Sequence, residues 1–169
     1  MYKRVMAPGE IEDELERLHV TSYVWALACC GRDREEAEDV LQASYLKVLE
    51  GSATFSGHSS FKTFLFGVIR RTASEVRRLN ALRRFLLADW GRGQSQPAAA
   101  PSPEERLTLL SALARLPRRQ RQVLELVFSM GLTVEEAAET LMISVGSARV
   151  HYDRGKRRVA KLVGLRGGS

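Results

Sequence analysis

Residues 142–158, MISVGSARVHYDRGKRR, place arginine and lysine side chains at helical spacing. Such groups neutralise phosphates and donate hydrogen bonds to base edges, so this stretch suits a helix that contacts DNA. At 100° per residue, Val145, Ala148 and Tyr152 lie on the same side as Gly155 and face the protein. The opposite, exposed side is predicted to contact DNA and comprises Gly146, Ser147, Arg149, Val150, Asp153, Arg154 and Arg157.

Asp153 is unusual on this surface, because a carboxylate near phosphates is repelled by them. It could accept a hydrogen bond from a cytosine amino group in the major groove. Alternatively it could orient Arg149 or Arg157, each four residues away along the helix. We favour the orienting role, because an arginine would then neutralise the acid. His151 lies towards the buried side, so we expect it to pack rather than to read bases.

The elements before this helix predict a helix-turn-helix. Thr133 and Glu136 form a capping box that begins a short helix over 134–142, and Ser144 is the predicted cap of the next one. Met142 stands in the turn, where a left-handed residue with a side chain would cost about 1 kcal/mol unless the turn differs. A merely solvated basic helix is the simpler alternative, but it does not explain the preceding helix and turn.

The charge distribution divides the chain. The net charge is +6, but residues 1–51 hold 6 basic and 11 acidic groups, whereas residues 52–169 are basic. This pattern favours a polyanion partner for the later parts and a different partner for the first. No apolar run approaches the roughly 20 residues that span a bilayer, and the basic start lacks an apolar leader segment, so we expect a cytoplasmic protein without membrane insertion.

The remaining reactive residue types do not form a recognisable centre. The adjacent Cys29 and Cys30 are interpreted as reduced core residues, with a thiol sensor as the alternative. The three histidines, His19, His58 and His151, are scattered, and no spacing matches a metal site or a phosphate-binding loop. We therefore predict no cofactor, no metal and no catalytic activity.

The whole chain is predicted to be all-α, because no alternating run bounded by turns indicates a strand. Apolar spacing predicts helices over 10–31, 33–51 and 60–87, the second of them capped by Asp33. The first of these helices is expected to form one apolar stripe, which comprises Ile11, Leu15, Leu18, Ser22, Trp25 and Cys29. The apolar positions of the third helix, from Phe61 to Leu86, are expected to face inward, including Leu79 and Leu82. Arginine pairs at 70–71, 77–78 and 83–84 recur about every two turns and predict one basic ridge.

Residues 88–103, ADWGRGQSQPAAAPSP, are rich in Gly, Pro, Ala, Gln and Ser and are predicted to be a flexible linker. Residues 1–87 and 104–169 would then form two small helical domains. Helices are expected over 102–116, with Ser102 as its cap, and over 118–131.

Together these segments resemble the extracytoplasmic-function (ECF) sigma factors of bacterial RNA polymerase. DREEAEDVLQASYLKVLE and FSGHSSFKTFLFGVIRRTASEVRR resemble sigma region 2, and LPRRQRQVLELVFSMGLTVEEAAETLMISVGSARVHYDRGKRRVAKL resembles region 4. The order, the spacing and the intervening linker match as well. The resemblance implies that 1–87 binds core polymerase and the −10 promoter element, and that 104–169 binds the −35 element.

The resemblance also implies roles for individual residues. In the family, the acid and glutamine of the AEDxxQ segment bind the clamp helices of the largest polymerase subunit. Here the polymerase-binding positions are Asp39 and Gln42, with Leu46 and Lys47 on the same exposed face by helical spacing. Residues 51–60 correspond to the family's pocket for a flipped base of the −10 element. The predicted −10 contacts are Phe55, His58, Ser59, Ser60, Lys62, Thr63, Arg70 and Arg71; Phe55 is equally well interpreted as a core residue.

Several positions depart from the family pattern. Phe64, Arg71 and Glu75 replace residues that are usually Trp, Asn and Asp, so we expect promoter melting to be retained with an altered preference at −10. Val150 and His151 replace a small polar and a basic residue, which predicts an unusual −35 preference.

The predicted function is that of an alternative sigma factor whose partners are core RNA polymerase and promoter DNA. By resemblance alone, an anti-sigma factor is a further expected partner. A stand-alone helix-turn-helix regulator with an N-terminal effector or dimerisation domain is the first alternative. An enzyme with a DNA-binding tail is the second, and it lacks a candidate nucleophile or acid–base pair.

Overall fold

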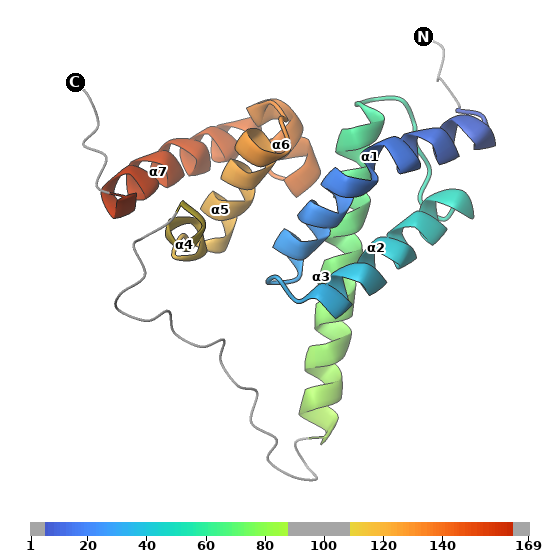
Figure 1. Ribbon diagram of the computed structural model, residues 1–169, viewed down its shortest axis with the longest axis horizontal. Helices are drawn as coiled ribbons and strands as arrows, with labels where there is room; N and C mark the ends of the chain where they lie inside the picture. Colours follow the sequence, from blue (N-terminus) through green and yellow to red (C-terminus); the bar gives the residue numbers. More distant parts are fainter. Residues whose placement is uncertain (1–5, 88–108, 164–169) are drawn as a thin grey trace.

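A computed structural model describes residues 6–87 and 109–163, and within these ranges every regular element is helical (Figure 1). The all-α prediction is therefore confirmed. The predicted linker 88–103 and the predicted cap at Ser102 lie outside the described residues. In chain order the elements are α1 (Pro8–Cys29), α2 (Arg34–Leu49), α3 (Phe61–Leu87), α4 (Leu109–Ala114), α5 (Arg118–Leu124), the π-helical turn η2 (Glu125–Ser129), α6 (Val134–Leu141) and α7 (Val145–Val163).

The first three helices pack together as the N-terminal domain (Figure 1). The apolar stripe expected on α1 is buried, and its centre is Trp25, which is fully enclosed. The indole Nε1–H of Trp25 donates to the backbone carbonyl of Phe66 on α3 at 3.0 Å. Burying each large side chain of this kind contributes about 1.5–3 kcal/mol, so α1 and α3 are held together mainly by this core. Asp33 caps α2 as predicted, accepting from the backbone N–H of Glu36 at 3.0 Å.

The last turns of α3 differ from the prediction. Leu79, Leu82 and Leu86 were expected to face inward, but they are 55%, 53% and 63% exposed. In Figure 1 this end of α3 extends beyond α1 and α2. The periodicity of α3 is therefore correct, but among the described residues no element covers Leu79, Leu82 and Leu86 in its last turns.

The remaining helices form the C-terminal domain, and its helix-turn-helix is confirmed. Thr133 and Glu136 cap α6 reciprocally, with hydrogen bonds of 2.8 and 3.1 Å to each other's side chains. Met142 ends α6 in the left-handed conformation, with φ 53° and ψ 49°. The strained form of the turn is thus the one adopted. Ser144 accepts from the N–H of Ser147 at 3.1 Å and caps α7 as predicted.

The two domains pack directly on each other, an arrangement we call closed. Helix α6 lies against α3, and buried residues of both domains belong to one continuous apolar cluster. The C-terminal domain contributes Leu126, Met130 and Leu141 to this cluster, and the N-terminal domain contributes Leu65 and Ile69. The prediction of two small domains is confirmed, but it did not include this shared core.

Candidate DNA and protein interfaces

The residues predicted to contact the −35 element lie on the solvent-facing side of α7. Gly146, Ser147, Arg149, Val150, Asp153, Arg154 and Arg157 are all exposed. The opposite side packs on the domain, where Ala148 and Gly155 are buried. A Cβ added at Gly155 would lie only 3.0 Å from Cδ1 of Leu124, so a glycine allows α7 to approach α5 this closely. Because this contact sets the position of α7, it also sets which side chains face outward.

The ion pairs on this face differ from the favoured interpretation of Asp153. Arg149 Nη2 binds Oε1 of Glu135 on α6 at 2.8 Å, and this hydrogen bond lowers the pKa of Glu135. Asp153 forms no ion pair with any described residue. The carboxylate that orients Arg149 is therefore Glu135, a residue that the helical wheel of α7 could not include. His151 is half-buried, as expected, and its Nδ1 is enclosed without a hydrogen-bond partner in the described structure.

The loop predicted to hold a flipped base borders a cavity of about 330 Å³. Phe55, Ser59 and Ser60 line this cavity as predicted, whereas His58 is exposed outside it. The ring of Phe55 also packs on Phe61 and Phe64, with centroid distances of 5.5 and 5.3 Å. Both interpretations of Phe55 thus apply, because its ring joins an aromatic cluster and the residue also lines the cavity. Sequence reasoning missed four further lining residues. Gly57 and Phe61 lie in or beside the loop, whereas Met6 and Glu14 precede it by some 40 residues.

The other predicted −10 residues are engaged by the C-terminal domain. Lys62 Nζ donates to the carbonyl of Met130, and Arg70 Nε donates to the carbonyl of Thr140 at 2.9 Å. Thr63 is buried, 2.8 Å from Ser60 Oγ, and makes a long contact of 3.5 Å with Glu136. Arg71, in contrast, is exposed. The closed arrangement therefore covers part of the predicted −10 surface, at Lys62, Thr63 and Arg70.

Three of the four residues predicted to bind polymerase share an exposed face of α2, and the fourth, Lys47, does not. Asp39 and Gln42 are exposed, and Leu46 is 50% exposed, an unusual position for leucine. Lys47 instead points towards α3, where its Nζ lies 2.5 Å from Glu75 and 3.2 Å from Thr72 Oγ1. The lysine thus joins two helices of the domain, which the spacing along α2 alone could not reveal.

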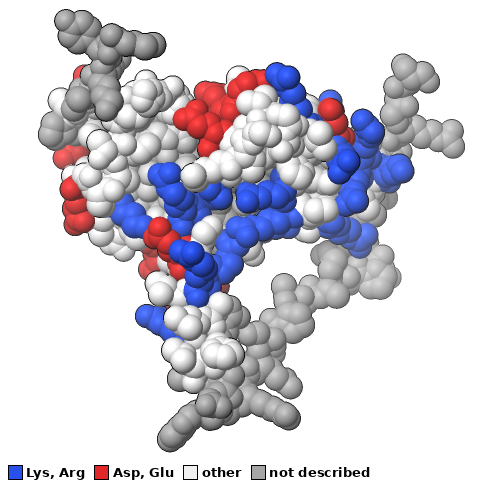
Figure 2. Space-filling model, turned by 180° about the vertical axis from the view of Figure 1, so that it is seen from behind, with Lys and Arg blue, Asp and Glu red and all other residues white. Residues whose placement is uncertain are grey.

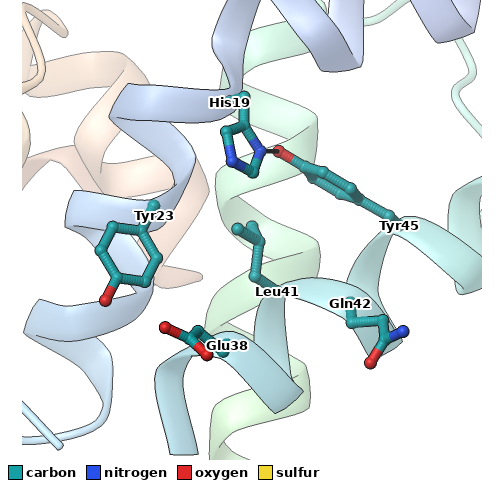
Figure 3. Close-up of a pocket in the computed structure, with 6 residues that line it drawn as sticks. All are labelled: His19, Tyr23, Glu38, Leu41, Gln42 and Tyr45. Carbon is teal, nitrogen blue, oxygen red and sulfur yellow. Dashed lines mark hydrogen bonds between the residues drawn. The ribbon is translucent and has the colours of Figure 1, made fainter. Parts of the chain in front are cut away.

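Beside this face, α1 and α2 border an open cavity of about 570 Å³ (Figure 3). Tyr23, Glu38 and Tyr45 line it, and Leu41 lies between them. The phenolic oxygen of Tyr45 is 3.3 Å from Nδ1 of His19. This cavity adds residues of α1 to the surface around Gln42.

The adjacent cysteines are free and buried. Burial is the main cause that raises the pKa of both thiols, to about 11 for Cys30. A raised pKa keeps a thiol protonated and unreactive, whereas a thiol sensor needs a thiolate. The interpretation as core residues fits this environment.

Within the described residues, no helix combines the length and apolar character needed to cross a membrane.

Comparison with known proteins identifies the family. Residues 15–84 match the family described as Sigma-70 region 2, and residues 106–159 match Sigma-70, region 4. The ECF RNA polymerase sigma factor SigX of Bacillus subtilis is 30% identical over 139 residues, covering 77% of this chain and 72% of SigX. The ECF RNA polymerase sigma factor SigF of Caulobacter vibrioides is 31% identical over 134 residues, covering 75% of this chain and 70% of that protein.

A solved structure shares the fold. The sigma factor RpoE of Bartonella quintana, crystallised with the anti-sigma factor NepR, superposes with a TM-score of 0.70 at 21% identity, covering 92% of this chain and 98% of that one. CnrH, solved with the cytosolic domain of CnrY, gives a TM-score of 0.63 at 19% identity, covering 93% and 89%. On these matches, the chain belongs to the ECF sigma factors and is an alternative sigma factor for transcription initiation.

Proposed function

We propose that this sigma factor binds core polymerase through the exposed face of α2 and promoter DNA through α7, the loop 51–60 and the start of α3. The observation that carries the α2 assignment is the pair Leu46 and Leu49, which are 50% and 49% exposed one turn apart, next to the exposed Gln42. Neighbouring exposed apolar side chains rimmed by polar groups are typical of protein interfaces. We propose no catalytic role for the chain and a cytoplasmic location, since its work is to bind polymerase and DNA.

Transcription from a cognate promoter with sigma-free core polymerase tests the α2 assignment. Leu46→Glu is expected to weaken core binding by about tenfold or more, because it places a charge in the apolar centre of the interface. Leu82→Glu, a similarly exposed leucine on α3, is the matched control and should bind core as the unmodified chain does. Equal core binding by both variants would contradict the α2 face.

For the −35 element we propose that Arg149, Val150, Asp153 and Arg154 contact bases and that Arg157 contacts phosphate. Since Glu135 already orients Arg149, Asp153 is available to accept from a cytosine amino group. Measuring promoter selectivity of Asp153→Ala separates its two roles. Loss of preference at one cytosine supports direct reading, and an unchanged base preference rules it out.

The loop cavity is proposed to hold an unstacked −10 base, with Phe55 as its stacking surface and Ser59 and Ser60 as polar partners. Arg70 and Arg71 are proposed to bind the phosphates of the opened strand. Ser59→Ala should change the preferred base in a single-stranded −10 oligonucleotide, whereas Arg71→Ala should weaken all sequences about equally. Equal effects of both variants on every sequence would contradict a base pocket.

We also propose regulation by an anti-sigma factor, because RpoE was solved with the anti-sigma factor NepR and CnrH was also solved with a protein partner, the cytosolic domain of CnrY. The test compares the affinity of the anti-sigma factor for the closed chain with its affinity for a variant whose domains are separated. An anti-sigma factor that acts on the closed arrangement should prefer the former, and equal affinities would contradict this mode.

A further inference from the structure

The closed arrangement gathers arginines from both domains at one edge of their interface. Arg77 and Arg78 on α3 and Arg118 at the start of α5 line a cavity of about 390 Å³, together with Ser74 and Ala81. No acidic residue is among the residues that line it. Figure 2 shows several groups of basic side chains across one face of the described molecule, with uncharged and some acidic side chains between and beside them.

These guanidinium groups are close enough to destabilise one another. The pKa of Arg118 is lowered chiefly by burial, and then by the positive charges of Arg77, Arg119 and Arg70. Burial also lowers the pKa of Arg70, followed by the charge of Arg119 across the interface. Two nearby acids are already paired elsewhere: Glu75 binds Lys47 at 2.5 Å, and Glu125 lies 3.8 Å from Arg32. Closing the domains therefore concentrates positive charge without a compensating anion among the described residues.

The cavity is held in place by the surrounding backbone. Arg77 Nη2 donates to the carbonyl of Cys29 at 2.8 Å, which fixes the side chain against the N-terminal domain. The hydroxyl of Ser74 donates to the carbonyl of Arg70 at 2.9 Å. Arginine forks positioned in this way bind phosphate oxygens in a bidentate manner, and two forks from different helices can bind adjacent phosphates.

We propose that this cavity binds a small polyanion with at least two linked phosphate groups, which bridges α3 and α5 and stabilises the closed arrangement. A volume of about 390 Å³ accommodates a short phosphate chain. Because the cavity needs residues of both domains, the ligand binds the closed arrangement and shifts the equilibrium towards it.

The test uses the full chain and inorganic tripolyphosphate, at constant ionic strength. Isothermal titration calorimetry should show saturable binding, and X-ray scattering should show a smaller radius of gyration than in chloride. Arg118→Gln and Arg78→Gln are each expected to weaken tripolyphosphate binding about tenfold, since each removes a charge-assisted hydrogen-bonding group. Arg115→Gln removes the same charge at the end of α4, outside the cavity, and should bind as the unmodified chain does.

Three results would overturn the proposal. Equal affinities of the cavity variants and Arg115→Gln would mean that only overall charge matters. If orthophosphate bound as tightly as tripolyphosphate and reduced the radius of gyration as much, linked phosphates would not be required. Binding of single-stranded DNA, but not of tripolyphosphate, with the same dependence on Arg118 would assign the cavity to DNA instead.

Discussion

The two surfaces that we propose to bind DNA differ in how far they are exposed to solvent. The exposed side of α7 faces solvent along its whole length, with Val150 45% exposed and its arginines on the outside. The proposed −10 surface, by contrast, is partly covered by the C-terminal domain through Lys62 and Arg70. The closed arrangement is thus compatible with −35 contacts on α7 and incompatible with full access to the −10 surface. Under the proposed −10 assignment, promoter opening requires the domains to separate.

The largest effect is expected from Thr140→Arg. Thr140 is 1% exposed beside the contact with Arg70, so a second guanidinium there should force α6 away from α3. We expect a larger radius of gyration and about tenfold tighter binding of a single-stranded −10 oligonucleotide, because the binding-competent state is no longer a minority.

Glu139→Arg is the control for Thr140→Arg. Glu139 is an exposed neighbour on α6, and its replacement adds more positive charge without touching the interface. If Glu139→Arg tightened DNA binding as much as Thr140→Arg does, the gain would come from charge and the contrast between the two surfaces would fail.

A second prediction concerns how α7 is positioned. Replacing a helical glycine by alanine usually stabilises a helix by about 0.5–1 kcal/mol. At Gly155, however, the new Cβ would lie 3.0 and 3.1 Å from Leu124, so we expect a net loss of about 1 kcal/mol by overpacking. Gly146→Ala, whose nearest neighbour is Ser144 Oγ at 4.0 Å, should be neutral or stabilising. Denaturant unfolding measures both, and a stabilising Gly155→Ala would show that α7 can shift freely.

The third prediction concerns Glu125, whose carboxylate is buried near the domain interface and faces Arg32 and Arg121. Burial raises its pKa above the ordinary value of 4.5, in spite of these two arginines. Its contribution to stability is therefore complete below pH 4.5 and is lost as pH rises through the raised pKa. Glu125→Gln should be more stable than the unmodified chain at neutral pH, by about 1 kcal/mol, because the uncharged amide avoids this loss.

Unfolding measured as a function of pH checks the sign for Glu125. The advantage of Glu125→Gln should disappear by about pH 4, where the acid is protonated. A difference that does not depend on pH would contradict a role for the buried charge.

The smallest effect is expected at the turn before α7. Met142 adopts a left-handed conformation although its side chain is 67% exposed, so little packing offsets the strain. Met142→Gly should stabilise the domain by at most about 1 kcal/mol, and Met142→Ala, which keeps the Cβ, should not. Thermal unfolding distinguishes the two. If Met142→Gly and Met142→Ala changed the stability equally, the left-handed backbone conformation of Met142 would not be the source of the strain.

Sequence reasoning predicted the local structure well because its causes are local. The caps at Asp33, Thr133 and Ser144 were found from residue types alone, since a side-chain oxygen there meets a backbone N–H three residues later. The buried stripe around Trp25 followed from helical periodicity. Helical periodicity also divided α7 into a packed and an exposed side. One residue was misplaced: Val145, predicted to face the protein, is 37% exposed in the first turn of α7.

Partners of individual side chains were harder to predict. Lys47 was assigned to the polymerase face but pairs with Glu75, and Arg149 pairs with Glu135 rather than with Asp153. Each true partner lies on a different helix, and a helical wheel compares positions on one helix only. The inward orientation predicted for Leu79, Leu82 and Leu86 failed for a related reason, because periodicity does not show whether a neighbour is present to cover them.

By itself, the sequence determined the helices, their caps, the helix-turn-helix and the resemblance that led to the family. Only the tertiary structure decided that α6 covers α3, that Arg70 binds the carbonyl of Thr140, and that arginines of both domains meet at one edge. The physical reason is range: helix formation depends on neighbours within about one turn. Packing of residue 70 against residue 140 depends on shape and charge that are complementary only after both domains have folded.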